Sequence, residues 1–293
     1  MPPTTPRDAL VSILIPSFNG ADFLGEAIRS VFDQSYEPIE LVVVDDGSTD
    51  ASRQVIADLC RYSPLAGVTV IAQANRGAHA AINRGLEAAR GEYLAILNCD
   101  DLYRPERIAS LVPYLRTTGG LVFSGLRLID EVGNRLAWDH DWSAWYRRAL
   151  AGLDESPTVG YSLLLHNVSV TSSNFLFTRD LLERTGSFRD YRFVHDWDFL
   201  MRSLYHAEPI FVGEDLLSYR VHRFNAAESI RHRLFDEASS ALRGYADLCR
   251  AVAPANVLAP CRANWPAYFR SFASRRAPFF ADDRPLASLI ETW

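Results

Sequence analysis

Residues 93–101 read Tyr-Leu-Ala-Ile-Leu-Asn-Cys-Asp-Asp, an apolar run that ends in one amide and two acids. The run from Tyr93 to Leu97 predicts a buried β-strand. In an open α/β sheet, ligands bind outside the carboxyl ends of the strands. Carboxylates at such an end suit a hard divalent cation, and such a cation suits a diphosphate. Acids after a strand are also common turn residues and helix caps, so this segment needs support from the rest of the chain.

Three further strands are predicted upstream, at residues 11–15, 41–44 and 68–72. Apolar residues at helical spacing follow each of them, and a helix over about 105–116 follows the strand at 93–97. Strands that alternate with helices of this length predict an α/β fold with a mostly parallel sheet flanked by helices. The strand at 41–44 also ends in paired acids, Asp45-Asp46, and a shared ligand crevice is preferred over acids that only shape turns.

The pattern is less regular beyond residue 120. Strands are predicted at 121–129 and 214–221, while residues 136–160 show no clean periodicity. Two interpretations of Trp138, Trp142 and Trp145 in this stretch stay open: a surface that stacks on sugar rings, or anchors for a loop. From about Ala227 onward, apolar residues at helical spacing predict a long amphipathic helix.

Composition excludes several classes of protein. The chain has 293 residues, 48% of them hydrophobic, and a net charge of −6, which argues against broad nucleic-acid binding. Four scattered cysteines suggest neither a zinc site nor a disulfide framework, which favours a reducing cytoplasmic setting. The residues before Pro6 are not typical of a signal peptide, and no apolar run is long enough to span a bilayer. All 30 basic residues are Arg, which we attribute to composition bias.

Four segments carry a more specific pattern, and they occur in a fixed order. Residues 11–19 read Val-Ser-Ile-Leu-Ile-Pro-Ser-Phe-Asn, and residues 42–50 read Val-Val-Val-Asp-Asp-Gly-Ser-Thr-Asp. The third segment is 91–101, with Pro105 after it, and the fourth is His-Asp-Trp-Asp at 195–198 with Tyr-Arg-Val-His at 219–222. Together they resemble glycosyltransferase family 2, whose members have the Rossmann-like GT-A fold. The resemblance covers roughly residues 8–230.

The resemblance implies an inverting transferase that uses a nucleotide-diphosphate sugar, UDP-sugar by default, with Mn²⁺ or Mg²⁺. The strand end at Pro16 and Ser17 is expected to lie along the nucleotide, and Asp46 or Asp45 to bond its base. The residues that the resemblance assigns to the nucleotide sugar are Pro16, Ser17, Asp45, Asp46, Asn83, Asn98, Asp100 and Arg220.

The third segment corresponds to the D-x-D motif of the family, with Asn98 in place of the first acid. In an extended strand end, residues two apart share a face, so Asn98 and Asp100 are expected to point together and Cys99 away from them. Asp100 is expected to bind the metal with support from Asp101, and His222 to be a further ligand. With one carboxylate fewer than usual, weaker metal affinity is expected.

The candidate general base is Asp196, with Asp198 as second choice. The family usually has Glu-Asp at this point, and this chain has His195-Asp196. One carboxylate near the anomeric carbon is needed to take the proton of the acceptor hydroxyl as that hydroxyl attacks. The structural alternative for Asp196 is a helix cap. The implied reaction is a single in-line displacement on a saccharide or lipid-linked acceptor, in cell-surface polysaccharide or glycolipid synthesis.

Two other functions are considered. A sugar-nucleotide nucleotidyltransferase is expected to have a Gly-rich loop and a basic residue after the first strand, where this chain has Pro16-Ser17-Phe18-Asn19. A non-catalytic nucleotide- or carbohydrate-binding relative stays open because of Asn98 and His195.

The expected domains are a GT-A domain over 8–226, with a nucleotide-binding half (8–105) and an acceptor-side half (106–226), and a helical C-terminal extension over 227–293. Packing is the preferred role for this extension. Contact with the inner membrane face is the alternative, because arginines lie among aromatic residues there. They are Arg231, Arg233, Arg270, Arg275 and Arg276.

Overall fold

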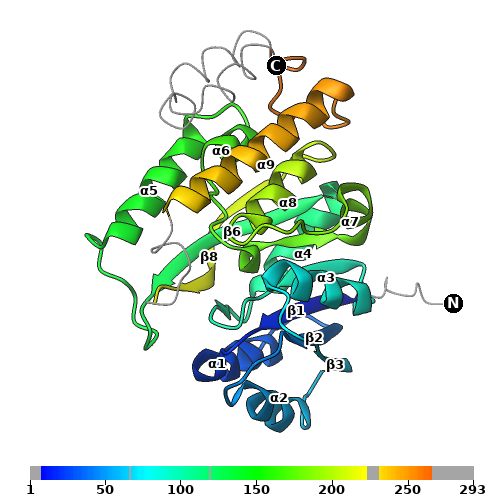
Figure 1. Ribbon diagram of the computed structural model, residues 1–293, viewed down its shortest axis with the longest axis vertical. Coiled ribbons are helices and arrows are strands. Elements are labelled where there is room, and N and C mark those ends of the chain that lie inside the picture. The colour runs from blue at the N-terminus through cyan, green and yellow to red at the C-terminus, as the bar shows by residue number, and fades with distance from the viewer. Residues whose placement is uncertain (1–7, 66, 119, 223–230, 266–293) are drawn as a thin grey trace, which may run out of the picture.

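The computed structural model describes residues 8–65, 67–118, 120–222 and 231–265 (Figure 1). Within them an eight-stranded sheet has the strand order β3-β2-β1-β4-β7-β6-β8-β5. The strands are β1 (Val11–Ser17), β2 (Ile39–Asp45), β3 (Gly67–Ala72), β4 (Tyr93–Ile96), β5 (Leu102–Tyr103), β6 (Leu121–Ile129), β7 (Leu176–Thr178) and β8 (Ile210–Arg220). The helices are α1 (Ala21–Phe32), α2 (Ser52–Cys60), α3 (Ala78–Ala88), α4 (Arg107–Thr118), α5 (Asp141–Asp154), α6 (Val159–Leu165), α7 (Arg179–Thr185), α8 (His195–Leu204) and α9 (Arg231–Ala251). The predicted α/β class is confirmed.

The first four strands in the sheet order are parallel, as predicted. Both β1 and β2 are buried along their whole length, because parallel strands covered on both faces are continuous apolar runs. Ser17 pairs with Asp45 in their register, so the two strands end at the same level. The polar residues that follow therefore meet at one edge of the sheet.

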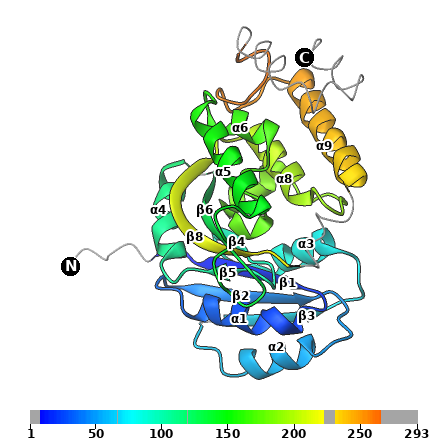
Figure 2. The ribbon, with the colours of Figure 1, turned by 90° about the vertical axis from the view of Figure 1, so that its left-hand side faces the viewer.

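The second half of the sheet is mixed. Strand β7 runs antiparallel to both β4 and β6, while β8 runs parallel to β6 and antiparallel to β5. A bulge at Ser124–Leu126 shifts the register between β6 and β8. Strand β8 begins at Ile210, four residues before the predicted start, and it curves strongly across the molecule (Figure 2). A helix, α5, occupies the stretch for which no periodicity was found.

Two hydrophobic cores lie on opposite faces of the sheet, because alternate side chains of a strand point to opposite faces. On β1, Leu14 belongs to the core shared with α3, α7, α8 and α9. Its neighbours Ile13 and Ile15 belong to the other core, shared with α1, α2, α4 and α5. The helices thus sandwich the sheet.

The predicted C-terminal helix is confirmed as α9, which lies across the upper half of the molecule beside α8 (Figure 1). Ala238, Leu242 and Tyr245 on its inner side are buried in the same core as α8. Residues 266–293, with Arg270, Arg275 and Arg276, lie outside the described residues. No helix in the described ranges has the length and apolarity needed to cross a membrane.

Candidate functional site

The ends of β1 and β2 bring Ser17 and Asp46 together. The Asp46 amide donates to the Ser17 carbonyl at 2.8 Å. The buried Asp46 carboxylate accepts from the Gln73 side chain at 2.7 Å and from the amides of Arg76 and Gly77 at 2.9 and 2.8 Å. A carboxylate has about four lone-pair sites, so one site is left after these three bonds. Asp46 therefore fixes the loop before α3 and keeps some capacity to accept from a ligand.

Asp45 lies one residue earlier and has different partners. It accepts from the Ser48 amide at 3.2 Å and from Arg53 Nε at 2.7 Å. Burial works to raise the pKa of Asp45, but the bonds from Ser48 and Arg53 outweigh it and hold the pKa below its usual value. Asp45 is thus an ionised residue that holds the turn after β2. Gly47 completes that turn with φ +79°, and a Cβ there would lie 2.8 Å from the Asn75 amide nitrogen.

Three residues assigned to the nucleotide lie at the end of β1 or on α3. The Ser17 hydroxyl is buried, and no group in the described ranges hydrogen-bonds to it. Pro16 precedes it in the buried end of β1. Asn83, on α3, accepts from the Phe188 amide at 2.9 Å and donates to the Phe188 carbonyl at 2.8 Å. Its side chain therefore joins α3 to the loop after α7.

The acid segment after β4 is held by a short 3₁₀ turn, Ser172–Asn174, and by Thr171 before it. Asn98 donates to the Thr171 hydroxyl at 2.9 Å and accepts from the Ser172 hydroxyl at 3.1 Å. Its own amide donates to Ser173 Oγ at 2.9 Å. A carboxylate accepts only, whereas an amide side chain both donates and accepts. Asn rather than Asp at this position therefore suits the turn.

The expectation that Asn98 and Asp100 share a strand face does not apply, because β4 ends at Ile96. Asp100 instead lies against His222, with 3.0 Å between its Oδ2 and His222 Nε2. The His222 ring also packs on Phe23, with 5.2 Å between ring centroids. Cys99 is next to Gly20, where a Cβ would come within 2.6 Å of the Cys99 sulfur. Asp100 and His222, both expected to be metal ligands, are thus in direct contact.

Asp101 is a buried structural acid. It accepts from the Ser173 hydroxyl at 2.5 Å and from the Arg220 amide at 3.0 Å. Burial and the neighbouring Asp100 charge raise the pKa of Asp101 well above its ordinary value. Both carboxylate oxygens are therefore bound to protein groups.

Arg220 is buried as well, with a side chain only 1% exposed. Its guanidinium donates to Glu26 at 2.6 Å, to the Asp100 carbonyl at 3.0 Å and to the carbonyls of Asp130 and Glu131 at 3.3 and 2.8 Å. It therefore joins α1, the acid segment and the turn after β6. This arrangement leaves little room for the diphosphate contact expected from the sequence.

A divalent cation fits part of the predicted ligand set. Asp100 and His222 supply one carboxylate and one imidazole side by side, and Asp100 is 28% exposed. Mg²⁺-type sites often use only one or two carboxylates together with substrate phosphates. Asp101 does not fit, because its oxygens are already bonded. Within the ranges the structure describes, no group of three or more His, Cys, Asp or Glu side chains has metal-binding geometry.

Asp196 lies in the first turn of α8, and the N-cap residue of this helix is Val194 rather than Asp196. One carboxylate oxygen accepts from the Trp197 amide at 2.7 Å and the other from Asn167 Nδ2 at 3.1 Å. Burial raises the pKa of Asp196, although the hydrogen bonds from the Trp197 amide and from Asn167 oppose the shift. A buried carboxylate with raised pKa has the character of a general base.

His195 is the neighbour that replaces the usual Glu. Burial lowers the pKa of His195, so the ring is neutral near pH 7. Within the described residues its Nδ1 has no hydrogen-bond partner.

Asp198 has a structural role. It forms a buried ion pair with Arg202 at 2.8 Å, one helical turn away, and a longer contact of 3.4 Å with Arg189. Arg202 in turn donates to the carbonyls of Thr185 and Ser187, at the end of α7. A carboxylate bound in this way is poorly placed to take a proton from an acceptor.

One segment, residues 167–174, contacts both the acids after β4 and the candidate base. Asn167 bonds Asp196, while Thr171, Ser172 and Ser173 bond Asn98 and Asp101. Sequence reasoning missed these residues. The only available signal was the polar run Thr-Ser-Ser-Asn at 171–174 within an otherwise apolar region.

Comparison with known proteins agrees with this arrangement. A sequence profile described as "Glycosyl transferase family 2" matches residues 12–186. An uncharacterized glycosyltransferase of Rickettsia typhi, RT0329, is 30% identical over 217 residues, which are 73% of this chain and 64% of that protein. The putative teichuronic acid biosynthesis glycosyltransferase TuaG of Bacillus subtilis is 32% identical over 128 residues, which are 43% of this chain and 50% of that protein. The chain thus spans less than two thirds of the length of either relative.

Solved structures are similar at the level of the fold. S. aureus TarS 1-349 in complex with UDP-GlcNAc superposes with a TM-score of 0.66 at 17% identity, covering 93% of this chain and 75% of that one. The mannosyltransferase PcManGT from Pyrobaculum calidifontis, in complex with GDP-Man and Mn²⁺, gives a TM-score of 0.61 at 19% identity, covering 98% and 79%. The GT-A fold expected from the sequence is confirmed. Since the family profile covers more than half of its residues, this chain belongs to glycosyl transferase family 2.

Proposed function

We propose that the chain transfers a sugar from a nucleoside-diphosphate sugar to an acceptor hydroxyl, with inversion at the anomeric carbon. The contact between His222 and Asp100 supports this most, because it joins two segments 122 residues apart in the chain, one of which follows β4, the strand next to β1. UDP is the proposed nucleotide. TarS was solved with UDP-GlcNAc and with UDP, and PcManGT with GDP-Man and Mn²⁺.

In the proposed mechanism, Ser17 and Asp46 bind the nucleotide at the strand ends. The buried Ser17 hydroxyl supports this assignment, since a ligand group there would give it the partner that the described residues do not supply. Asp100 and His222 would hold Mn²⁺ or Mg²⁺, which neutralises charge on the leaving diphosphate when bound. Asp101 and Arg220 keep these two side chains in place.

Asp196 is the proposed general base. Its carboxylate takes the proton of the acceptor hydroxyl as that oxygen bonds to the anomeric carbon. The bond to the diphosphate breaks on the opposite face, so no covalent enzyme intermediate forms. The name of TuaG supports a cell-surface polysaccharide as the acceptor class, with a glycolipid as the alternative.

Thermal melting with UDP-, GDP- and dTDP-sugars, each with and without Mn²⁺, tests the proposal. A ligand at 100 times its Kd adds about 2.7 kcal/mol of stability. In a chain of this size, that raises the melting temperature by roughly 5–10 °C. We expect such a rise with a UDP-sugar, larger with Mn²⁺ than without, and reduced by His222→Ala. No rise with any nucleotide sugar in either condition would contradict the proposal.

A further inference from the structure

The three tryptophans for which the sequence left two interpretations have separate roles. The rings of Trp142 and Trp145 meet edge to face at 5.7 Å, and Trp142 also packs on Tyr219 at 5.6 Å. Both are partly buried against the core and anchor α5 to β8. Trp138 is different, because 74% of it is exposed. It therefore contributes little to the core and is available to a ligand.

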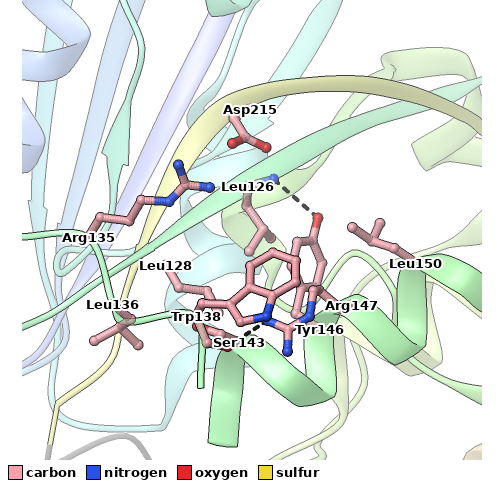
Figure 3. Close-up of a pocket in the computed structure, with 10 residues that line it drawn as sticks. All are labelled: Leu126, Leu128, Arg135, Leu136, Trp138, Ser143, Tyr146, Arg147, Leu150 and Asp215. Carbon is pink, nitrogen blue, oxygen red and sulfur yellow. Dashed lines mark hydrogen bonds between the residues drawn. The ribbon is translucent and has the colours of Figure 1, made fainter. Parts of the chain in front are cut away.

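Trp138 lines a pocket of about 500 Å³ between the β6–β8 pair, the turn after β6 and α5. Leu126, Leu128 and Leu136 give the pocket an apolar side. Figure 3 shows Arg135 and Asp215 toward the strands, with Trp138 and Arg147 toward α5. The pocket thus combines an aromatic ring, apolar surface and charged groups of both signs.

The indole of Trp138 is held in place by Arg147. The guanidinium carbon lies 3.6 Å from the ring centroid, and Arg147 Nη1 donates to the Trp138 carbonyl at 2.6 Å. Such a contact between a cation and a ring orders both side chains. An exposed aromatic ring that is already ordered costs little entropy when it binds a ligand.

The two charged side chains across the pocket, Arg135 and Asp215, suit the hydroxyls of a neutral ligand better than they suit a ligand with a net charge. Asp215 lies over Gly125, where a Cβ would meet its carboxylate at 3.0 Å, because the bulge in β6 brings the two residues into register. The exposed Arg135 guanidinium forms no ion pair within the described chain. Guanidinium groups donate and carboxylates accept, whereas a sugar hydroxyl does both. The pocket therefore matches an uncharged sugar ring with an apolar face and neighbouring hydroxyls.

The pocket lies next to the candidate site along the strands. Leu128 pairs with Tyr219, and the next pair is Ile129 with Arg220, whose Nε donates to the Asp100 carbonyl. One residue of strand is about 3.3 Å long, so the backbone at Leu128 lies one strand residue from the pair that includes Arg220, while successive side chains point to opposite faces of the sheet.

We propose that this pocket is a binding subsite for an uncharged hexopyranose unit of the acceptor, with Trp138 against the ring and Arg135 and Asp215 on its hydroxyls. The proposal rests on the proposed function, because it takes the bound saccharide to be the acceptor of the same reaction. It names the bound unit of the acceptor as a neutral sugar rather than a lipid headgroup.

Saturation-transfer NMR with methyl glycosides of glucose, galactose, mannose and N-acetylglucosamine tests the subsite on the full chain. We expect ring protons of at least one glycoside to receive saturation, and Trp138→Ala to weaken the binding roughly tenfold, as loss of an aromatic anchor does at a binding hot spot. Arg135→Gln is a second variant and is expected to weaken binding of the same glycoside. Tyr62→Ala is the matched control, because Tyr62 is 78% exposed and also has an Arg beside its ring, away from the pocket.

Failure of the subsite and failure of the proposed function give different results. If nucleotide sugars raise the melting temperature but glycoside binding is absent or unchanged in both variants, the subsite proposal is wrong. If a glycoside binds through Trp138 and no nucleotide sugar does, the pocket is a sugar-binding site, but the transferase proposal and the role of the pocket as an acceptor subsite are wrong. Trp138→Ala is expected to leave the nucleotide-induced rise in melting temperature unchanged.

Discussion

Asp196, the proposed base, is structurally fixed and yet keeps the capacity to accept a proton. The Trp197 amide and Asn167 orient its two oxygens, while burial disfavours the charged form. Two hydrogen bonds leave lone pairs free for a substrate proton. Asp198, two residues further along the helix, forms an ion pair with Arg202. The two candidate bases are therefore distinguished by their partners rather than by their position on the helix.

We expect the acid limb of kcat/KM to have its midpoint above about pH 4, the ordinary pKa of an aspartate. Burial raises the pKa of Asp196 in the folded protein, so the proton leaves at higher pH and activity is lost as the pH falls through that value. A pH profile of kcat/KM measures this. A midpoint at or below pH 4 would contradict the assignment of Asp196.

Asp196→Asn is expected to reduce turnover by at least about a hundredfold, the usual contribution of a general base. Nucleotide-sugar affinity should change little. The raised pKa means that the charged form of Asp196 costs stability at neutral pH, so the neutral Asn should keep or raise the melting temperature. Turnover and calorimetric binding measure the two effects, and unchanged turnover would reject Asp196 as the base.

Asp198→Asn is expected to act on stability instead. It leaves Arg202, whose side chain is 6% exposed, without its carboxylate, and breaking a buried pair costs about 3–5 kcal/mol. Urea unfolding measures the loss. A stable variant with no turnover would favour Asp198 over Asp196 as the base.

At the scale of elements, the turn at Ser172–Asn174 joins the two halves of the sheet. Asn174 lies on its buried side, where it accepts from Arg107 Nη2 at 3.1 Å and from the Ser124 amide at 3.0 Å. On its other side Ser173 bonds Asn98 and Asp101. The turn is therefore the support on which the acid segment after β4 rests.

Ser173→Ala is expected to destabilise the protein by about 1–3 kcal/mol, because a buried carboxylate and a buried amide each lose a partner. Ser63→Ala is the control. Among the described residues, the Ser63 hydroxyl accepts only from the Leu65 amide, in the turn after α2, and its loss should cost well under about 1 kcal/mol. Urea unfolding of both variants measures the difference, and equal costs would mean that the turn does not support the acids.

Elements were predictable where their signal is local. β1 and β2 are unbroken apolar runs, so they were found from the sequence alone. β5 and β7 have two and three residues, too few for any periodicity, and they exist because β8 and β4 offer a partner. The inner face of α5 includes Tyr146 and Gly152, which do not form the apolar stripe that marks a helix.

The candidate site was less predictable than the elements, because its contacts join residues far apart in the chain. The nearness of Asp100 and His222 followed from the family resemblance, since no local pattern connects residues so far apart in the chain. The role of Asn98 could not be inferred, because its partners are hydroxyls whose positions depend on the tertiary fold. The burial of Arg220 was missed for the same reason.

At the scale of the whole molecule, α9 reaches the candidate base through one acid. Glu237 accepts from the amides of Arg192, Phe193 and Val194, at 3.1, 2.8 and 3.3 Å. These three residues lead directly into α8, whose second residue is Asp196. The C-terminal helix therefore fixes the start of the helix that carries the base.

Glu237→Ala is expected to lower kcat between about tenfold and a hundredfold, because small displacements of a catalytic group cost that much. Nucleotide-sugar affinity should be unchanged, since the residues proposed to bind it lie on other elements. Asp236→Ala is the control, because its side chain is exposed and adjacent in sequence. Steady-state kinetics measure kcat for the two variants. An equal kcat in both would contradict a positioning role for α9.

The contact of Glu237 with residues 192–194 also bears on how acceptor specificity can change within this family. The family profile ends at residue 186, before the candidate base and before α9. Under the proposed function, relatives can share the half that binds the activated donor, while each has its own support for the residue that acts on the acceptor. Substitutions that change the acceptor should accordingly accumulate in the last third of such chains, where they leave the donor-binding residues intact.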